Sequence, residues 1–200
     1  MRLADRLRHA LEESGRNKTV LLDGDDGGVP FAGQKTLMPA AVLIAVTERD
    51  EPSVLLTVRN AELRRHAGQV AFPGGRIDPE DGGPVAAALR EAEEEIGLPA
   101  SSVDIVGVAD RYRTVTGFDI TPVVGVVPPD LVLVPHAAEV AAVFEVPLAL
   151  LLEPANFAER TVFWEGRERS YFELMWDDHR IWGATAAMIV NIGRRLAGHL

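Results

Sequence analysis

The chain of 200 residues contains no cysteine. Disulfide bonds, thiolate metal sites and a cysteine nucleophile are therefore excluded. Any bound metal must sit on carboxylate, imidazole or backbone oxygen, and this ligand set favours hard ions such as magnesium or manganese.

Excess positive charge and long apolar runs are also lacking. The net charge of −10 argues against a nucleic-acid partner, because such proteins normally present a basic surface. A small phosphorylated substrate stays compatible with it, because bound cations can reverse the local sign of a site. No segment approaches the roughly 18 apolar residues of a membrane span, and the N-terminal stretch MRLADRLRHALEESG lacks the features of a signal peptide. We expect a cytoplasmic protein without a membrane partner.

What is present indicates one globular domain of mixed structure. Apolar residues make up 47% of the chain and charged residues 25%, and the length suits a single domain with a substantial core. Periodicity and turn residues predict helices at Leu3–Glu13, Pro84–Ile96 and Ala184–Leu196. They predict strands at Ala40–Val46, Ser53–Val58, Gln69–Pro73, Val103–Ala109, Ile120–Val127 and Val140–Val146, and a hairpin of Thr161–Trp164 with Tyr171–Trp176. This order favours an α/β or α+β sandwich, a mixed sheet with helices on both faces.

An Asp- and Gly-rich stretch, Asp23 to Gly33, separates the first helix from the first strand. The spacing of its acidic residues is faintly similar to that of a calcium loop. However, the twelfth position is Gln34, where such a loop needs a bidentate Glu. We interpret this stretch as a turn.

The helix ending in ALREAEEEIGL (Ala88 to Leu98) breaks two local rules. On a helical wheel one apolar arc is expected to pack on the sheet, and Glu91, Glu94 and Glu95 share a neighbouring arc, with Arg90 close to Glu94. Glu91 and Glu95 repel each other at i,i+4, and two carboxylates lie in the last turn, where the helix dipole disfavours negative charge. A divalent cation would resolve both conflicts, whereas the alternative is a solvated acidic face.

The residues before this helix favour the metal site. Phe72-Pro73-Gly74-Gly75 places two glycines directly after a predicted strand, where backbone can approach a metal or a phosphate closely. The order is therefore strand, glycine-rich loop and acidic helix.

These residues resemble the signature of the Nudix hydrolases, in which a Gly and a Glu precede Arg-Glu-apolar-x-Glu-Glu-x-Gly-apolar. Gly75 begins the pattern, and Arg90 to Leu98 complete its second half without a mismatch. Asp81 stands where the family has Glu, with eight residues instead of seven before Arg90, which puts the role of Asp81 in doubt. The resemblance implies a Nudix-type α/β/α sandwich. We expect one domain over 1–200, with an N-terminal helix and loop over 1–38 and a core over 40–187.

The stretch Leu55 to Gly75 is similar to the additional signature of the coenzyme A pyrophosphatase branch. Arg59, Arg64, Gly68 and Phe72 stand at the expected spacings, and Asn60 replaces a small residue. Two later stretches, TVTGFDITPVVG (from Thr114) and IWGATA (from Ile181), also look like this branch.

The resemblance implies a magnesium- or manganese-dependent hydrolysis of a diphosphate, with Glu91 and Glu95 as the main ligands and the Gly75 carbonyl as a further one. Glu94 is then a third ligand or the base that orients water, and Arg90 positions a carboxylate. Glu139 is the candidate for a base or additional ligand late in the chain, with a helix cap or surface role as the alternative.

Coenzyme A carries a diphosphate and a 3′-phosphate, so its site should contain fixed guanidinium groups. Arg59 and Arg64 are the candidate substrate-binding residues, with Arg65 beside them. The alternative is that Arg64 and Arg65 are surface charges or pair with the carboxylates. For His66 the sequence favours a structural or hydrogen-bonding role over a catalytic one.

Three functional hypotheses follow from the sequence. The first is cleavage of coenzyme A or a derivative, and the second is cleavage of another nucleoside diphosphate derivative, such as ADP-ribose, a dinucleotide or a damaged nucleotide. The third is a non-catalytic nucleotide-binding module, which should have lost carboxylates that this chain keeps. Association into a homodimer stays open.

Overall fold

The computed structural model describes residues 1–14, 21–22, 24–25, 36–164 and 166–197. The helices are α1 (Leu3–Ser14), α2 (Pro84–Ile96), α3 (Leu148–Leu152) and α4 (Gly183–Leu196). The strands are β1 (Met38–Thr47), β2 (Ser53–Arg59), β3 (Val70–Ala71), β4 (Gly74–Arg76), β5 (Asp104–Val108), β6 (Tyr112–Arg113), β7 (Phe118–Val127), β8 (Val140–Pro147), β9 (Ala158–Trp164), β10 (Arg167–Trp176) and β11 (His179–Trp182).

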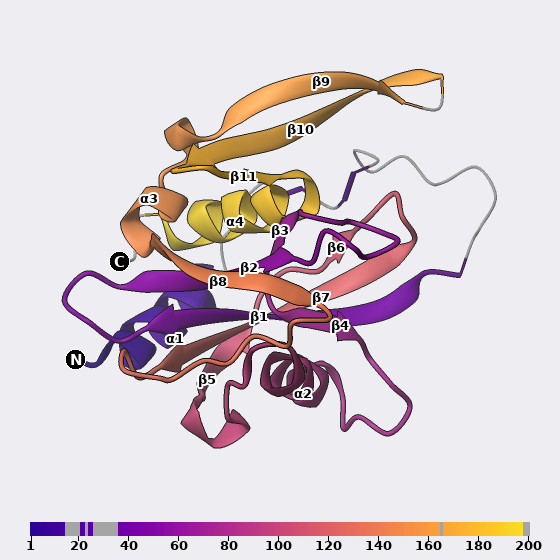
Figure 1. Cartoon of the computed structure of the whole chain (residues 1–200). Helices are drawn as coiled ribbons and strands as arrows, with labels where there is room; N and C mark the ends of the chain where they lie inside the picture. The colour runs from indigo at the N-terminus through magenta and orange to yellow at the C-terminus, as the bar shows by residue number, and fades with distance from the viewer. Residues whose placement is uncertain (15–20, 23, 26–35, 165, 198–200) are drawn as a thin grey trace.

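A mixed sheet forms the centre of the molecule (Figure 1). Its main order is β3-β2-β1-β7-β5, while β8 pairs with β2, β4 with β1 and β6 with β7. β1 and β7 run parallel along their whole length, from Met38–Phe118 to Thr47–Val127, and the other pairs in this sheet are antiparallel. Both parallel strands are long apolar runs, which suits strands covered on both faces.

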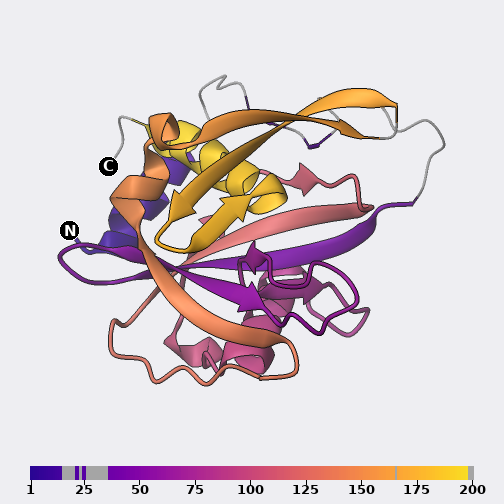
Figure 2. The same cartoon turned by 45° about the horizontal axis from the view of Figure 1, so that its top comes forward.

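Helices cover both faces of this sheet, so the predicted α/β/α sandwich is confirmed. In Figure 1, α2 lies on one side of the sheet and α4 on the other, and the second sheet, of order β11-β10-β9, covers α4. Figure 2 shows α1 and α4 together on the same side. The core is accordingly divided in two, with the alanines of α2 in one cluster and the apolar residues of α1 and α4 in the other.

The bounds of α2 agree with the sequence expectation residue for residue. Pro84 occupies the first turn, where its missing N–H costs little. Gly97 ends the helix in the left-handed region, at φ 66°, and the end of the helix is closed by N–H bonds to the carbonyls of Ala92 and Glu93. The predicted apolar arc is also confirmed, because Ala88, Ala92 and Ile96 are buried against the sheet.

Other elements differ from the expectation in ways that affect the site. The strand expected at Gln69–Pro73 is confirmed only as the shorter β3, and the two glycines expected as a loop belong to a separate strand: β3 pairs with β2, whereas β4 pairs with β1. Pro73 lacks an N–H and cannot continue a ladder as a donor, so the partner changes there. The predicted hairpin is confirmed and is longer than expected, with Arg167 opposite Trp164. The expected Asp23–Gly33 turn lies outside the described residues except for Gly24 and Asp25.

Candidate active site

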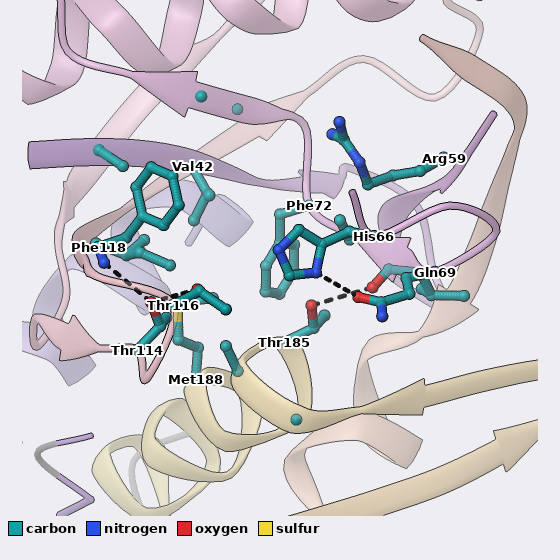
Figure 3. A pocket seen from close by; sticks show the side chains of 18 of the residues that line it. Val42, Arg59, His66, Gln69, Phe72, Thr114, Thr116, Phe118, Thr185 and Met188 are labelled. Carbon is teal, nitrogen blue, oxygen red and sulfur yellow. Dashed lines mark hydrogen bonds between the residues drawn. The ribbon is translucent and has the colours of Figure 1, made fainter. Parts of the chain in front are cut away.

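A cavity of about 440 Å³ opens beside α2 on the edge where several elements meet. Its wall combines residues from β1, β2, β4, α2, β7, β11 and α4 with residues of the connecting loops. Figure 3 shows Arg59, His66 and Gln69 around one part of the cavity, and Thr114, Phe118 and Met188 around another. The cavity therefore has a charged part beside α2 and a part lined by hydroxyl and apolar groups.

Glu95 is the most deeply buried carboxylate of the site, with 4% of its surface exposed. The Gly74 N–H donates to its Oε2 at 3.0 Å, and Arg59 Nη1 lies 3.7 Å from its Oε1. Burial raises the pKa of Glu95 to about 7, although the Gly74 N–H and Arg59 both favour the charged form. One hydrogen bond and one more distant guanidinium are thus insufficient to replace the hydration that this carboxylate has lost.

Glu91 lies one helical turn earlier, against the backbone of Gly75. A Cβ at Gly75 would lie 2.5 Å from the Glu91 carboxyl carbon, so this contact requires glycine. Burial also raises the pKa of Glu91, while Arg90 acts in the opposite direction. Glu91, Glu95, Gly74 and Gly75 therefore form one side of the cavity.

Arg90 lies beside the cavity wall and connects α2 to the loop before it. Its Nε and Nη2 donate to the two carboxylate oxygens of Asp81 at 3.0 and 2.9 Å. Its Nη1 donates to Glu91 and to Glu94, each at 3.1 Å. The predicted proximity of Arg90 to Glu94 is confirmed, and Asp81, whose role the sequence left in doubt, is the bidentate partner of Arg90. This hydrogen bonding holds the pKa of Asp81 below its ordinary value.

Glu94 takes a different direction from the other two carboxylates. Its side chain is 61% exposed, is bound by Arg90 and does not belong to the cavity wall. The helical wheel predicted that Glu94 shares one face of α2 with Glu91 and Glu95. In the structure this face extends from the cavity into solvent. A long side chain at this boundary is free to follow its ion-pair partner.

Glu139 reaches the cavity from a loop that runs along the end of α2. The N–H of Val134 donates to the Ile96 carbonyl at 2.9 Å, and the N–H of His136 donates to the Glu95 carbonyl at 2.8 Å. The Glu139 carbonyl accepts the Asn60 N–H at 2.8 Å. These bonds satisfy helix-end carbonyls and bring Glu139 into the wall with Glu91 and Glu95.

The predicted substrate-binding arginines are separated by the fold. Arg59 lines the cavity, and in the described part of the chain its Nε is buried without a hydrogen-bond partner. Arg64 lies on the loop after β2, is exposed, and is not part of the cavity wall. Only Arg59 of the two is therefore placed beside the acidic residues.

The sequence expectation assigned no role to several residues of the cavity wall. Thr114, Phe118, Thr185 and Met188 line it, and the Thr185 hydroxyl donates to the Val70 carbonyl at 3.1 Å. The signal was present, since Thr114 and Phe118 belong to one of the stretches similar to the coenzyme A branch and Thr185 to the other. The sequence alone could not predict that these residues line the same cavity.

The donor set of the cavity fits a hard divalent cation. Among the described residues, no group of three or more His, Asp or Glu side chains is close enough to hold an ion without rearrangement. However, Glu91 and Glu95 are carboxylates whose burial raises their pKa, and a Cβ at Gly75 would occupy the space of the Glu91 carboxylate. Oxygen ligands of this kind suit magnesium or manganese.

Comparison with known proteins identifies the class of this chain. Residues 37–168 match the family model of the NUDIX domain, and the chain belongs to the Nudix family. It is a pyrophosphohydrolase of this family. No described helix is long and apolar enough to span a membrane.

Its relatives include Nudix hydrolases of enteric bacteria. NudL of Escherichia coli strain K12, an uncharacterized Nudix hydrolase, is 45% identical over 157 residues, which are 78% of this chain and 82% of that protein. NudL of Cronobacter sakazakii is 47% identical over the same length. The crystal structure of RenU, a Nudix hydrolase from M. smegmatis, aligns with a TM-score of 0.49 at 27% identity over 56% of this chain and 72% of that chain.

Proposed function

We propose that the protein hydrolyses the diphosphate bond of coenzyme A or its derivatives, giving 4′-phosphopantetheine and adenosine 3′,5′-bisphosphate. One observation carries the proposal. The three stretches that are similar to the coenzyme A branch are distant in sequence, and residues of all three line the same cavity as Glu91 and Glu95. Arg59 and Phe72 come from the first stretch, Thr114 and Phe118 from the second, and Trp182 to Thr185 from the third.

The acidic side of the cavity is proposed to hold the metal. Glu91 and Glu95 are the main ligands, with the Gly75 carbonyl as a further one, and Glu94 joins them only if it leaves Arg90. A magnesium or manganese ion held there would neutralise charge that develops on the phosphate oxygens and would acidify a water molecule.

The remaining residues position these groups and the substrate. Arg90 fixes Glu91 and Asp81 through charge-assisted bonds and does not contact the substrate. Glu139 accepts the proton of the attacking water, because it lies on the cavity wall and, among the described residues, its carboxylate is only loosely held, with His136 Nδ1 at 3.6 Å. Arg59, on the cavity wall, binds a phosphate oxygen through its guanidinium group.

The test is incubation of the purified protein with coenzyme A and magnesium, followed by chromatography with mass detection. We expect 4′-phosphopantetheine and adenosine 3′,5′-bisphosphate, and no products after chelation of the metal. ADP-ribose, a dinucleotide and a damaged nucleotide are assayed in parallel. Cleavage of one of these, with coenzyme A and its thioesters intact, would reject the proposed substrate and favour the second hypothesis.

A further inference from the structure

We infer that His66 is a substrate-binding residue whose Nε2 donates a hydrogen bond to a phosphate oxygen of the bound diphosphate. The inference rests on the proposed diphosphate substrate but not on its being coenzyme A. It starts from the loop between β2 and β3, which carries no regular structure and yet is closed by bonds within itself. The Arg59 N–H donates to the Gln69 carbonyl at 2.9 Å, and the Gly68 N–H donates to the Arg59 carbonyl at 3.1 Å.

The backbone of His66 is held in the left-handed region, at φ 56°. Only His66 and Asp177 among the described non-glycine residues have a positive φ, and Asp177 lies in the tight turn between β10 and β11. A non-glycine residue in this region costs about 1 kcal/mol, whereas glycine adopts it freely. Gly68, two residues later, has φ 69°, so the same loop uses glycine where nothing else is required of the side chain. The imidazole of His66 therefore has a role that offsets the strain.

A contact with Gln69 orients the ring of His66 at the cavity wall. Its Nδ1 is 3.0 Å from the amide oxygen of Gln69, and both residues line the cavity. Figure 3 shows one ring nitrogen joined to Gln69 and the other on the side of the ring that faces away from Gln69, towards Phe118 across the cavity. Because Nδ1 is engaged by Gln69, Nε2 is the ring nitrogen that remains for a ligand among the contacts of the described residues.

The neighbouring groups identify the ligand chemistry as phosphate. Arg59, the last residue of β2 before this loop, brings a guanidinium group to the cavity wall. A guanidinium and an imidazole on one cavity wall are groups suited to anionic oxygen. The carboxylates Glu91, Glu95 and Glu139 lie on the same wall and would repel an anion unless cations accompany it, which fits a metal-bound diphosphate.

Two substitutions separate the two nitrogens of the ring. Gln places an amide donor near the position of Nε2, and Asn places one near Nδ1. If Nε2 binds phosphate, His66→Gln retains much of the activity and His66→Asn retains little. A purely structural role through the Gln69 contact predicts the opposite order, and this result would overturn the inference.

His66→Gly is the decisive variant, because it removes the ring and also the backbone strain. We expect kcat/KM to fall about 10- to 100-fold, the loss of a hydrogen bond to a charged group, while the melting midpoint stays within about 3 °C of the parent. A lowered midpoint with unchanged kcat/KM would show a structural residue and reject the inference.

A binding measurement keeps this test independent of the substrate. Calorimetry with magnesium and imidodiphosphate, which resists hydrolysis, should give at least a tenfold higher Kd for His66→Gly than for the parent protein. If the parent binds this probe and the variant binds it weakly while coenzyme A is not cleaved, the proposed substrate fails and the inference stands. Equal Kd values, or no binding to the parent, would overturn it.

Discussion

Glu91 and Glu95 occupy positions four residues apart on α2, and the fold gives each of them a different restraint. Glu95 accepts a hydrogen bond from the Gly74 N–H. Glu91 accepts one from the Arg90 side chain and lies against the backbone of Gly75. In both, burial raises the pKa of the carboxyl group. A pair of carboxylates that the protein desolvates and supplies with few cations is suited to a ligand that brings its own positive charge.

At this scale we predict that Glu91→Gln and Glu95→Gln each lower kcat by at least about a hundredfold in the presence of magnesium. Each change removes a negative oxygen ligand while preserving the size of the side chain. Glu93→Gln on the same helix is the matched control, since Glu93 is exposed and lies outside the cavity wall. Initial rates at saturating coenzyme A measure the effect. Full activity of both cavity variants would refute the metal assignment.

The sequence predicted these two residues because their repulsion along one helix face is visible in the spacing. It did not predict that the Glu94 side chain points away from the cavity. That direction depends on Arg90, which binds Glu94 and is itself held by Asp81 on the loop before α2. The partner of His66 was equally hidden, since the contact with Gln69 depends on the backbone path of the intervening turn. Residue type and spacing thus indicate a site, while side-chain direction follows from neighbours outside the motif.

At the scale of elements, β4 supplies two consecutive glycines with different requirements. A Cβ at Gly74, where φ is 151°, would lie 2.6 Å from the Cα of Val42 in β1, and backbone cannot move aside cheaply. A Cβ at Gly75 would meet only the end of the Glu91 side chain.

We therefore predict opposite outcomes for Gly74→Ala and Gly75→Ala. Gly74→Ala should lower the free energy of unfolding by about 2–4 kcal/mol, because the pairing of β4 with β1 must be displaced. Gly75→Ala should fold with a small change in stability but lose most of its kcat, since Glu91 is moved. Urea unfolding and initial rates distinguish them. A stable, active Gly74→Ala protein would contradict this account of β4.

The connection between α2 and the preceding loop gives a second prediction at this scale. Arg90→Lys cannot keep the two-oxygen contact with Asp81 and also reach Glu91, because an ammonium is a single point of charge. We expect kcat/KM to fall about tenfold and the melting midpoint to fall by a few degrees. Arg49→Lys, in an exposed ion pair with Glu145, is the control and should change neither quantity. Parent-like kcat/KM in Arg90→Lys would show that this network does not position Glu91.

The elements themselves were predictable where local signals agree. α2 has Pro84 at its start and Gly97 in the left-handed region at its end, and its bounds matched. By contrast, α3 and β11, of five and four residues, are too short for a periodic pattern, and their existence depends on packing against α4. The strand β4 was also not predicted, because its sequence Gly-Gly-Arg is typical of a loop and its pairing with β1 depends on the fold.

At the scale of the whole molecule, the cavity depends on β1 and β7 lying parallel in the centre of the sheet. This pairing brings Val42 of β1 and Phe118 of β7 to one cavity wall, while α2 and α4 approach from opposite faces. The buried carboxyl groups of the cavity therefore exist only in the folded protein. Because the same groups keep their ordinary pKa values in the unfolded chain, their effect on the free energy of unfolding varies with pH.

The pKa of Glu95 rises from 4.5 in the unfolded chain to about 7 in the folded protein. Between these values the folded protein holds a proton that the unfolded chain has released. The contribution of Glu95 is thus fully present below about pH 4.5 and is lost as the pH rises through 7. Asp81 and Glu173, whose pKa values are lowered, affect stability only at lower pH.

We predict that, without metal, the free energy of unfolding of the parent protein falls by about 1–3 kcal/mol more than that of Glu95→Gln when the pH rises from 5 to 8. The variant lacks this effect because its amide carries no charge at either pH. Magnesium should reverse this loss, because it binds the ionised carboxylates of the folded state. Its stabilising effect should therefore be larger at pH 8 than at pH 5, and small in Glu95→Gln at both. Thermal unfolding with and without magnesium at the two pH values measures it. Equal magnesium stabilisation of parent and variant at pH 8 would place the ion away from Glu95.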